Sequence, residues 1–207
     1  MNFLNDKLLK QALTHRSWVN ENDKNSGTNE RLEFLGDAIL EFIVSKAIYE
    51  KFPEEEEGYL TALRANLVNT KNLSEVAKKL EIGKMLLLSK GEEDGGGRNN
   101  SSLLADTVEA IIGALFIDQG LEAAEKFISE NILVDVEKKA KLPLKDPKSL
   151  LQEKIQSKNL PTPKYQVVSE VGPDHNKEFT IEVVVNGTRL GLGQGKSKSE
   201  AEQDAAS

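Results

Sequence analysis

The stretch NERLEFLGDA, residues 29–38, puts three acids on one face of a helix. Glu30, Glu33 and Asp37 are three, four and seven positions apart, and residues at these spacings are neighbours on a helix surface. Apolar side chains fill the positions around them: Leu32, Phe34, Leu35 and Ile39. The stretch therefore predicts an acidic stripe on an otherwise apolar helix.

A second stretch, LADTVEAIIGA at residues 104–114, repeats this pattern with Asp106 and Glu109. If the two helices pack together, four carboxylates converge in a partly dry site, where divalent cations must neutralise their repulsion. Oxygen ligands of this kind suit magnesium or manganese. The alternative is a solvated acidic face, the usual place for Asp and Glu. Apolar residues on both sides of the acids favour the buried seam.

Helical periodicity runs through the first two thirds of the chain, without competing strand alternation. The polar segment at residues 91–102 is expected to be a flexible loop, with Ser101 or Ser102 capping the helix that follows. Residues 138–147 combine charge with two prolines, which is typical of an interdomain linker. Helices are expected at residues 8–18, 29–51, 58–80, 101–117 and near 121–139.

The pattern changes at residue 146. Asp146 and Pro147 are suited to begin a short helix as its cap and first residue. Alternating apolar residues then predict strands at residues 164–171, 179–185 and 189–194, with a tight turn at Asn186 and Gly187. Ser197 and Glu200 form a capping box for a final helix. The order is helix, three strands, helix.

The ten residues 29–38 resemble the signature of ribonuclease III, and the later order of elements resembles the double-stranded-RNA-binding domain. The resemblance covers nearly the whole chain. It implies an all-α endonuclease domain at residues 1–140, a linker at 141–147, and a small α-β-β-β-α domain at 148–207 whose last helix is shorter than usual. Three further segments support it in the expected order: ALTHRSW at 12–18, EGYLTALRANLV at 57–68 and LADTVEAIIGALFIDQG at 104–120.

The resemblance implies a magnesium-dependent endonuclease that cuts double-stranded RNA, with manganese as a possible substitute. Two ions roughly 4 Å apart would activate water and neutralise the leaving 3′ oxygen, giving 5′ phosphates and short 3′ overhangs. It also implies a homodimer with Phe34 and Leu35 at the contact, and cytoplasmic processing of ribosomal and messenger RNA. The implied metal ligands are Glu33, Asp37, Asp106 and Glu109, supported by Glu30, with Glu57 as a secondary acid.

The second domain suggests where RNA would bind. Gln152 and Gln156 lie four apart on its first helix, where they can reach a shallow RNA minor groove. The resemblance adds His175 in the turn between the first two strands. Lys196 and Lys198 flank the start of the last helix, which favours phosphate. Ser199 stands where a third lysine is common in the family, and this predicts a weaker grip on phosphate.

Two other features invite functional interpretations that the spacing does not support. GLGQGKS, residues 191–197, looks like a phosphate-binding loop, but Leu190 stands where that motif requires glycine. No nucleotide cofactor is therefore expected, and the glycines are interpreted as sites of close backbone packing. His15 is interpreted as a structural residue, because it lacks a partnered nucleophile.

Composition limits the classes of partner and compartment that fit this chain. The net charge of −7 is unfavourable for general nucleic-acid affinity, which comes from neutralising phosphates, so RNA binding must depend on a few well-placed side chains. The absence of cysteine fits a reducing compartment, and no apolar run approaches the ~20 residues of a membrane span. Two alternatives remain: a double-stranded-RNA-binding protein that does not cut, and a metal-dependent DNA nuclease.

Overall fold

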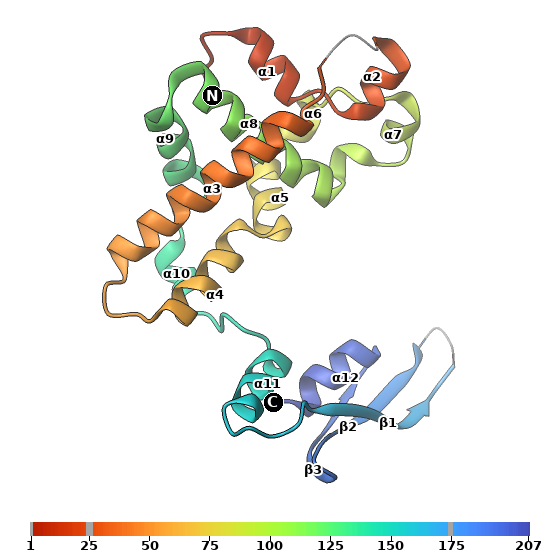
Figure 1. Ribbon diagram of the computed structural model, residues 1–207. Helices are drawn as coiled ribbons and strands as arrows, with labels where there is room; N and C mark the ends of the chain where they lie inside the picture. Colours follow the sequence, from red (N-terminus) through yellow and green to blue (C-terminus); the bar gives the residue numbers. More distant parts are fainter. Residues whose placement is uncertain (1, 24–26, 174–175) are drawn as a thin grey trace. The chain divides into compact units, whose positions relative to one another are not determined.

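The computed structural model describes residues 2–23, 27–173 and 176–207. The chain divides into two compact units, Met1–Leu144 and Lys145–Ser207, and each has its own core (Figure 1). Within the described ranges, no helix has the length and apolar character that crossing a membrane requires.

Apart from one isolated β-bridge between Thr14 and Leu87, the regular elements in the described part of the first unit are all helices, which confirms the predicted fold class. Its two longest helices, α3 and α8, cross near its centre (Figure 1). Leu40 and Ile43 of α3 and Ile111 and Ile112 of α8 belong to the core of this unit, and all four are almost fully buried. The helices are α1 (Asp6–Ala12), α2 (Arg16–Asn22), α3 (Glu30–Lys51), α4 (Glu57–Val68), α5 (Thr70–Lys79), α6 (Ile82–Met85), α7 (Lys90–Asp94), the 3₁₀ helix η1 (Gly97–Asn99), α8 (Ser101–Gln119), α9 (Leu121–Asn131) and α10 (Val136–Ala140).

Three helices that the sequence predicts as single are each divided into two in the structure. The helix predicted at 8–18 breaks because the backbone of Leu13 and His15 bonds to Leu87, at 2.9 and 3.1 Å. The helix predicted at 58–80 breaks at Asn69, whose side chain accepts a hydrogen bond from the Asn72 amide and starts α5. The helix predicted near 121–139 is interrupted by a turn at residues 132–135. Helical periodicity continues through each break, so the pattern alone does not reveal it.

The polar segment at residues 91–102 is more ordered than predicted. It contains the end of α7 and the whole of η1. Arg98 holds it, because one guanidinium nitrogen donates to the carbonyls of Gly83 and Leu86 at 2.9 and 3.0 Å. The cap of α8 is Asn100, not Ser101 or Ser102, and its side chain accepts bonds from two amides of the first turn.

The second unit is a three-stranded antiparallel sheet with two helices. Its elements are α11 (Pro147–Gln156), β1 (Lys164–Val171), β2 (Glu178–Val185), β3 (Thr188–Gly195) and α12 (Lys198–Ala205), with strand order β1-β2-β3. Ile181, Val183 and Val185 of β2 are buried in its core. Asn186 and Gly187 both have positive φ, as the predicted hairpin turn requires. The predicted α-β-β-β-α order is confirmed.

The glycines of β3 serve close packing. A Cβ atom at Gly191 would lie 2.2 Å from the carbonyl oxygen of Ala205, and one at Gly193 would lie 2.1 Å from the amide nitrogen of Ala205. Helix α12 therefore lies directly on the strand, with small residues at the contact. This agrees with the packing role predicted for the glycines.

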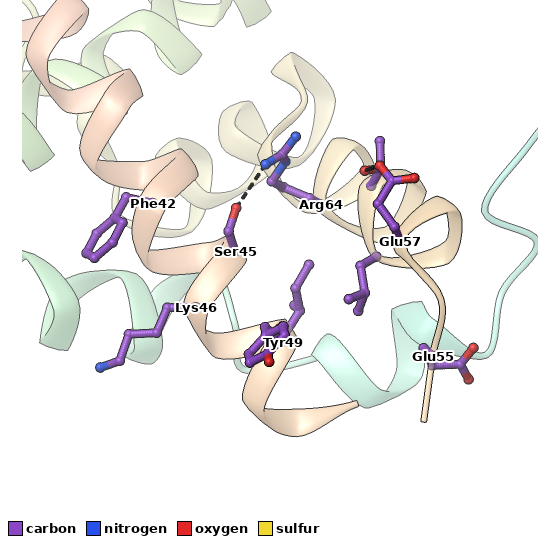
Figure 2. Close-up of a pocket in the computed structure, with 10 residues that line it drawn as sticks. Phe42, Ser45, Lys46, Tyr49, Glu55, Glu57 and Arg64 are labelled. Atoms are coloured by element: carbon purple, nitrogen blue, oxygen red, sulfur yellow. Dashed lines mark hydrogen bonds between the residues drawn. The ribbon is translucent and has the colours of Figure 1, made fainter. Parts of the chain in front are cut away.

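A largely apolar cavity of about 550 Å³ opens between α3 and α4 (Figure 2). Phe42 and Tyr49 line it from α3, and Leu60 lines it from α4. Arg64 of α4 bonds across to α3, donating to the Ser45 hydroxyl at 3.0 Å and pairing with Glu41 at 2.8 Å. These contacts join the two helices at one end of the cavity.

Candidate metal centre and active site

The acidic site is placed by a crossing of two helix backbones. A Cβ atom at Gly36 of α3 would lie 1.7 Å from the carbonyl oxygen of Glu109, and one at Gly113 of α8 would lie 2.2 Å from that of Leu32. No side chain larger than hydrogen fits at either position. Because the backbones touch here, acids within two turns of the crossing glycine on each helix are brought face to face.

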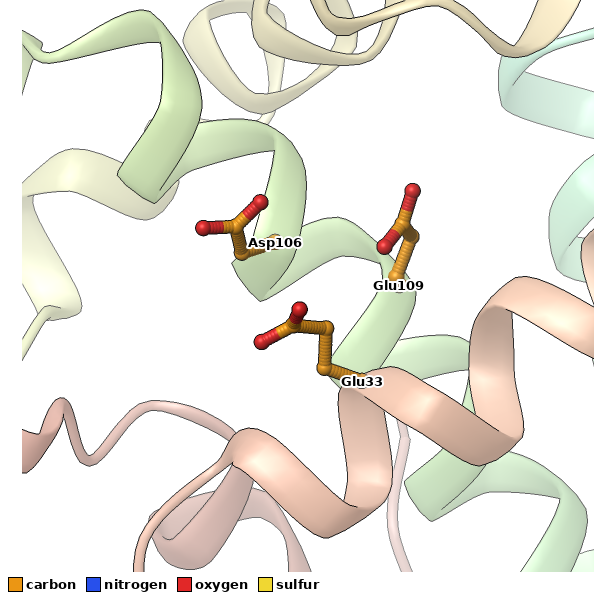
Figure 3. Close-up of side chains that lie close together, drawn as sticks. All are labelled: Glu33, Asp106 and Glu109. Atoms are coloured by element: carbon orange, nitrogen blue, oxygen red, sulfur yellow. The ribbon is translucent and has the colours of Figure 1, made fainter.

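Three of the predicted acids form a compact group (Figure 3). Glu33 comes from α3, whereas Asp106 and Glu109 come from α8. One carboxylate oxygen from each lies within 4.8 Å of the others, and all three side chains are half-buried. This is a hard oxygen donor set on two rigid helices, which fits a divalent cation such as magnesium or manganese.

The charges in this group are mutually unfavourable. Burial, together with the charges of Asp37, Asp106, Glu33 and Glu41, raises the pKa of Glu109 to about 8. Burial and the Asp106 charge also raise the pKa of Glu33. A carboxyl that holds its proton near neutral pH unless a cation replaces that proton is typical of a metal-ligand cluster.

The raised pKa of Glu109 predicts how stability depends on pH when no divalent ion is present. Between pH 4.5 and 8 the folded chain keeps a proton that the unfolded chain has released, so the free energy of unfolding falls as pH rises. Because Glu109 is only half-buried, we expect this loss to be about 1–2 kcal/mol, less than the full shift implies. The Glu109→Gln variant should not show this loss of stability. Thermal melts in chelator at pH 5.5 and 8.5 measure the difference, and parallel behaviour of the two proteins would contradict the pKa assignment.

The other predicted acids lie around this group. Asp37 is exposed one turn further along α3 and lies outside the group of three, although its charge acts on Glu33 and Glu109. Glu30 is held by the Thr28 hydroxyl at 2.9 Å and by Arg16 at 3.6 Å. Glu57 begins α4, accepts a bond from the Thr61 hydroxyl, and lines the cavity of Figure 2.

His15 has the structural role predicted for it, with one addition. It is the N-cap of α2, and its Nδ1 atom accepts a hydrogen bond from the Ser17 amide at 3.2 Å. Its proximity also lowers the pKa of Asp106, against the larger effect of burial. Sequence spacing gave no indication of this proximity, because residues 15 and 106 are brought together only by the tertiary fold.

The predicted RNA-binding side chains are accessible where the structure describes them. Gln152 and Gln156 are exposed on α11, whereas Ile155 is buried. Lys196 and Lys198 are exposed at the start of α12, where Glu200 accepts a bond from the Lys196 amide. His175 lies outside the described residues.

Two family models divide the chain between them. A ribonuclease-III-like domain matches residues 5–136, and a double-stranded RNA binding motif matches residues 147–207. The first match alone covers more than half of the chain. The chain belongs to the ribonuclease III family. With both domains present, it is a double-stranded-RNA endoribonuclease of that family.

Relatives and solved structures agree with this assignment. Ribonuclease 3 from Geobacillus sp. strain WCH70 is 49% identical over 99% of this chain and 83% of its own length. That from Halalkalibacterium halodurans is 48% identical over 100% and 79%. A solved structure of the nuclease domain of ribonuclease III from Campylobacter jejuni shows structural flexibility in a region involved in dimer formation. Its sequence is 42% identical to this chain. It covers 64% of this chain and 92% of its own, with a TM-score of 0.58.

Proposed function

We propose that this ribonuclease III hydrolyses duplex RNA with two magnesium ions, leaving 5′ phosphates and short 3′ overhangs. The observation that supports this most is the group of Glu33, Asp106 and Glu109, whose oxygens lie within 4.8 Å of one another. When bound, divalent ions would activate water and neutralise the charge on the leaving oxygen. Cytoplasmic processing of ribosomal and messenger RNA is the setting we propose for this activity.

The protein's own part in this chemistry is to hold and orient. Glu33, Asp106 and Glu109 would ligate the ions as carboxylates, and Asp37 would complete the ligand set from the exposed side of α3. Glu30, tethered by Thr28 and Arg16, would support the site from the start of the same helix. Glu57 retains the secondary role that the resemblance gave it.

We further propose that the enzyme acts as a homodimer built on α3. Phe34, Phe42 and Tyr49 leave 81%, 56% and 72% of their surfaces exposed along one side of this helix. Ala38, small and exposed, lies midway between the two phenylalanines. A two-fold axis near Ala38 would place Phe34 of each copy against Phe42 and the neighbouring cavity of the other. Leu35, the other predicted contact, packs partly against its own core.

Such a dimer would carry two identical acidic sites, one for each strand of a duplex. The second domain would add affinity through Gln152 and Gln156, and through Lys196, Lys198 and His175. A non-cutting RNA-binding protein is the less favoured alternative. It would gain nothing from a group of half-buried carboxylates whose pKa values are raised by burial.

Matched RNA, DNA and hybrid duplexes test the proposal. We expect magnesium to support cleavage of the RNA duplex only, because the binding domain suits A-form geometry and 2′-hydroxyls. Calcium should allow binding without cutting, and chelator should abolish cleavage. The products should be ligatable through 5′ phosphates. Cutting of the RNA duplex in chelator would exclude the metal mechanism, and equal cutting of DNA would exclude the RNA specificity.

A further inference from the structure

The segment that leads out of the first unit is bonded to α4 at two points. The Tyr59 hydroxyl donates to the carbonyl of Ala140 at 2.9 Å. The Asn66 side-chain amide donates to the carbonyl of Leu144 at 2.7 Å, and also to that of Ala62 at 3.1 Å. Residues 140–144, named the connector below, are therefore attached to the first unit at both ends.

Apolar and polar contacts reinforce these two bonds. Ala140 and Leu144 pack against the core of the first unit. The Tyr59 ring lies edge-on to Phe52, with ring centres 6.3 Å apart, so the hydroxyl is aimed by a packed ring. Just before the connector, the Lys139 amine donates to the side chain of Asn72, itself a buried residue of α5. The connector is thus part of the folded unit.

The second unit begins almost at once. Asp146 is the cap of α11, where its side chain accepts a bond from the Ser149 amide at 3.1 Å. Only Lys145 separates this cap from Leu144, and its amine pairs with Glu153 of α11 at 2.6 Å. A stretch whose composition predicts a flexible linker therefore contributes only about one residue of free tether.

We propose that Tyr59 and Asn66 are positioning residues that shorten the tether of the RNA-binding domain and so set how efficiently short duplexes are cut. This inference rests on the proposed function. If both bonds are lost, residues 141–144 join Lys145 as free chain, and at about 3.3–3.6 Å per residue this adds at most roughly 13–14 Å of reach. A longer tether dilutes the binding domain around the catalytic domain. A short duplex, which offers few positions for joint binding, should lose most.

The test begins with a readout that does not require cleavage. Tyr59→Phe with Asn66→Asp removes both donors, keeps the ring beside Phe52 and changes little volume. We expect trypsin to cut after Lys141 at least tenfold faster in this double variant, and at intermediate rates in the two single variants. Asn131→Asp is the matched control, since Asn131 makes the same bond four residues back, to Phe127, without touching the connector. Unchanged trypsin rates in folded protein would overturn the proposal.

Steady-state cleavage provides the second readout. For a duplex near the minimum length that is cut, we expect KM to rise three- to tenfold in the double variant, with kcat within twofold. Five Gly and Ser residues inserted after Leu144 of the wild-type chain should raise KM similarly while leaving the trypsin rate after Lys141 unchanged. This insertion also serves if the double variant fails to fold. If the wild-type enzyme cuts RNA but KM is unchanged in both variants, the tether proposal alone is refuted. Failure of the wild type to cut would refute the proposed function.

Discussion

Glu109→Gln is expected to lower the single-turnover rate of duplex RNA cleavage by about 10³-fold or more, with duplex affinity kept within about twofold. A loss of this size corresponds to about 4 kcal/mol in the barrier. The amide keeps the size of the side chain but removes the charge that holds a hard cation at the centre of the acidic group. The measurement pairs single-turnover cleavage in magnesium with a binding titration in calcium.

Glu122→Gln is the matched control, because Glu122 is an exposed residue of α9 and the change in charge is the same. It should leave both cleavage and binding unchanged. Near-normal cleavage by the Glu109 variant would remove this carboxylate from the site. Equal losses of binding and cleavage would mean that Glu109 has a structural role instead.

Phe34→Asp is expected to convert the proposed dimer to monomers and to suppress double-strand cleavage. Burying a phenylalanine side chain is worth about 1.5–3 kcal/mol, and a symmetric contact counts it twice. The dimer dissociation constant should therefore rise on the order of 10²- to 10⁴-fold. The fold of the monomer should be unaffected, since Phe34 is 81% exposed in it. Light scattering gives the oligomeric state, and circular dichroism reports the helix content.

Val134→Asp, in the turn between α9 and α10, is the control for an added surface charge. Val134 is also largely exposed, at 66%, but is not part of α3. It should leave the oligomeric state and the cleavage rate unchanged. A Phe34→Asp protein that stays dimeric at micromolar concentration would place the dimer contact elsewhere.

The acidic group was predictable because its pattern is local. Glu33 belongs to one helix, and Asp106 and Glu109 belong to another. Spacing and apolar neighbours within each helix are therefore enough to predict two facing acidic stripes. The distance between the helices was not predictable in the same way. It depends on Gly36 meeting Gly113, and a glycine inside a helix signals a close approach without naming its partner.

Two of the features that the sequence pattern does not reveal depend on long-range bonds. The pairing of Leu13 and His15 with Leu87 breaks the first helix, and the bonds from Tyr59 and Asn66 order a segment whose composition suggested a free linker. Charge and proline content predict the flexibility of a segment that makes no tertiary contacts. They carry no information about a donor on a distant helix.

The contact between Gly36 and Gly113 fixes the backbone positions of the metal-binding residues, whatever side chains stand there. Two touching backbones set the separation of α3 and α8, so no side-chain size or rotamer enters into it. Exchanging the acids leaves their Cα positions where the backbones hold them. The crossing is therefore a template on which other donor sets can be mounted. Histidines at positions 33 and 106, for example, would direct it towards zinc or copper without any redesign of the helices.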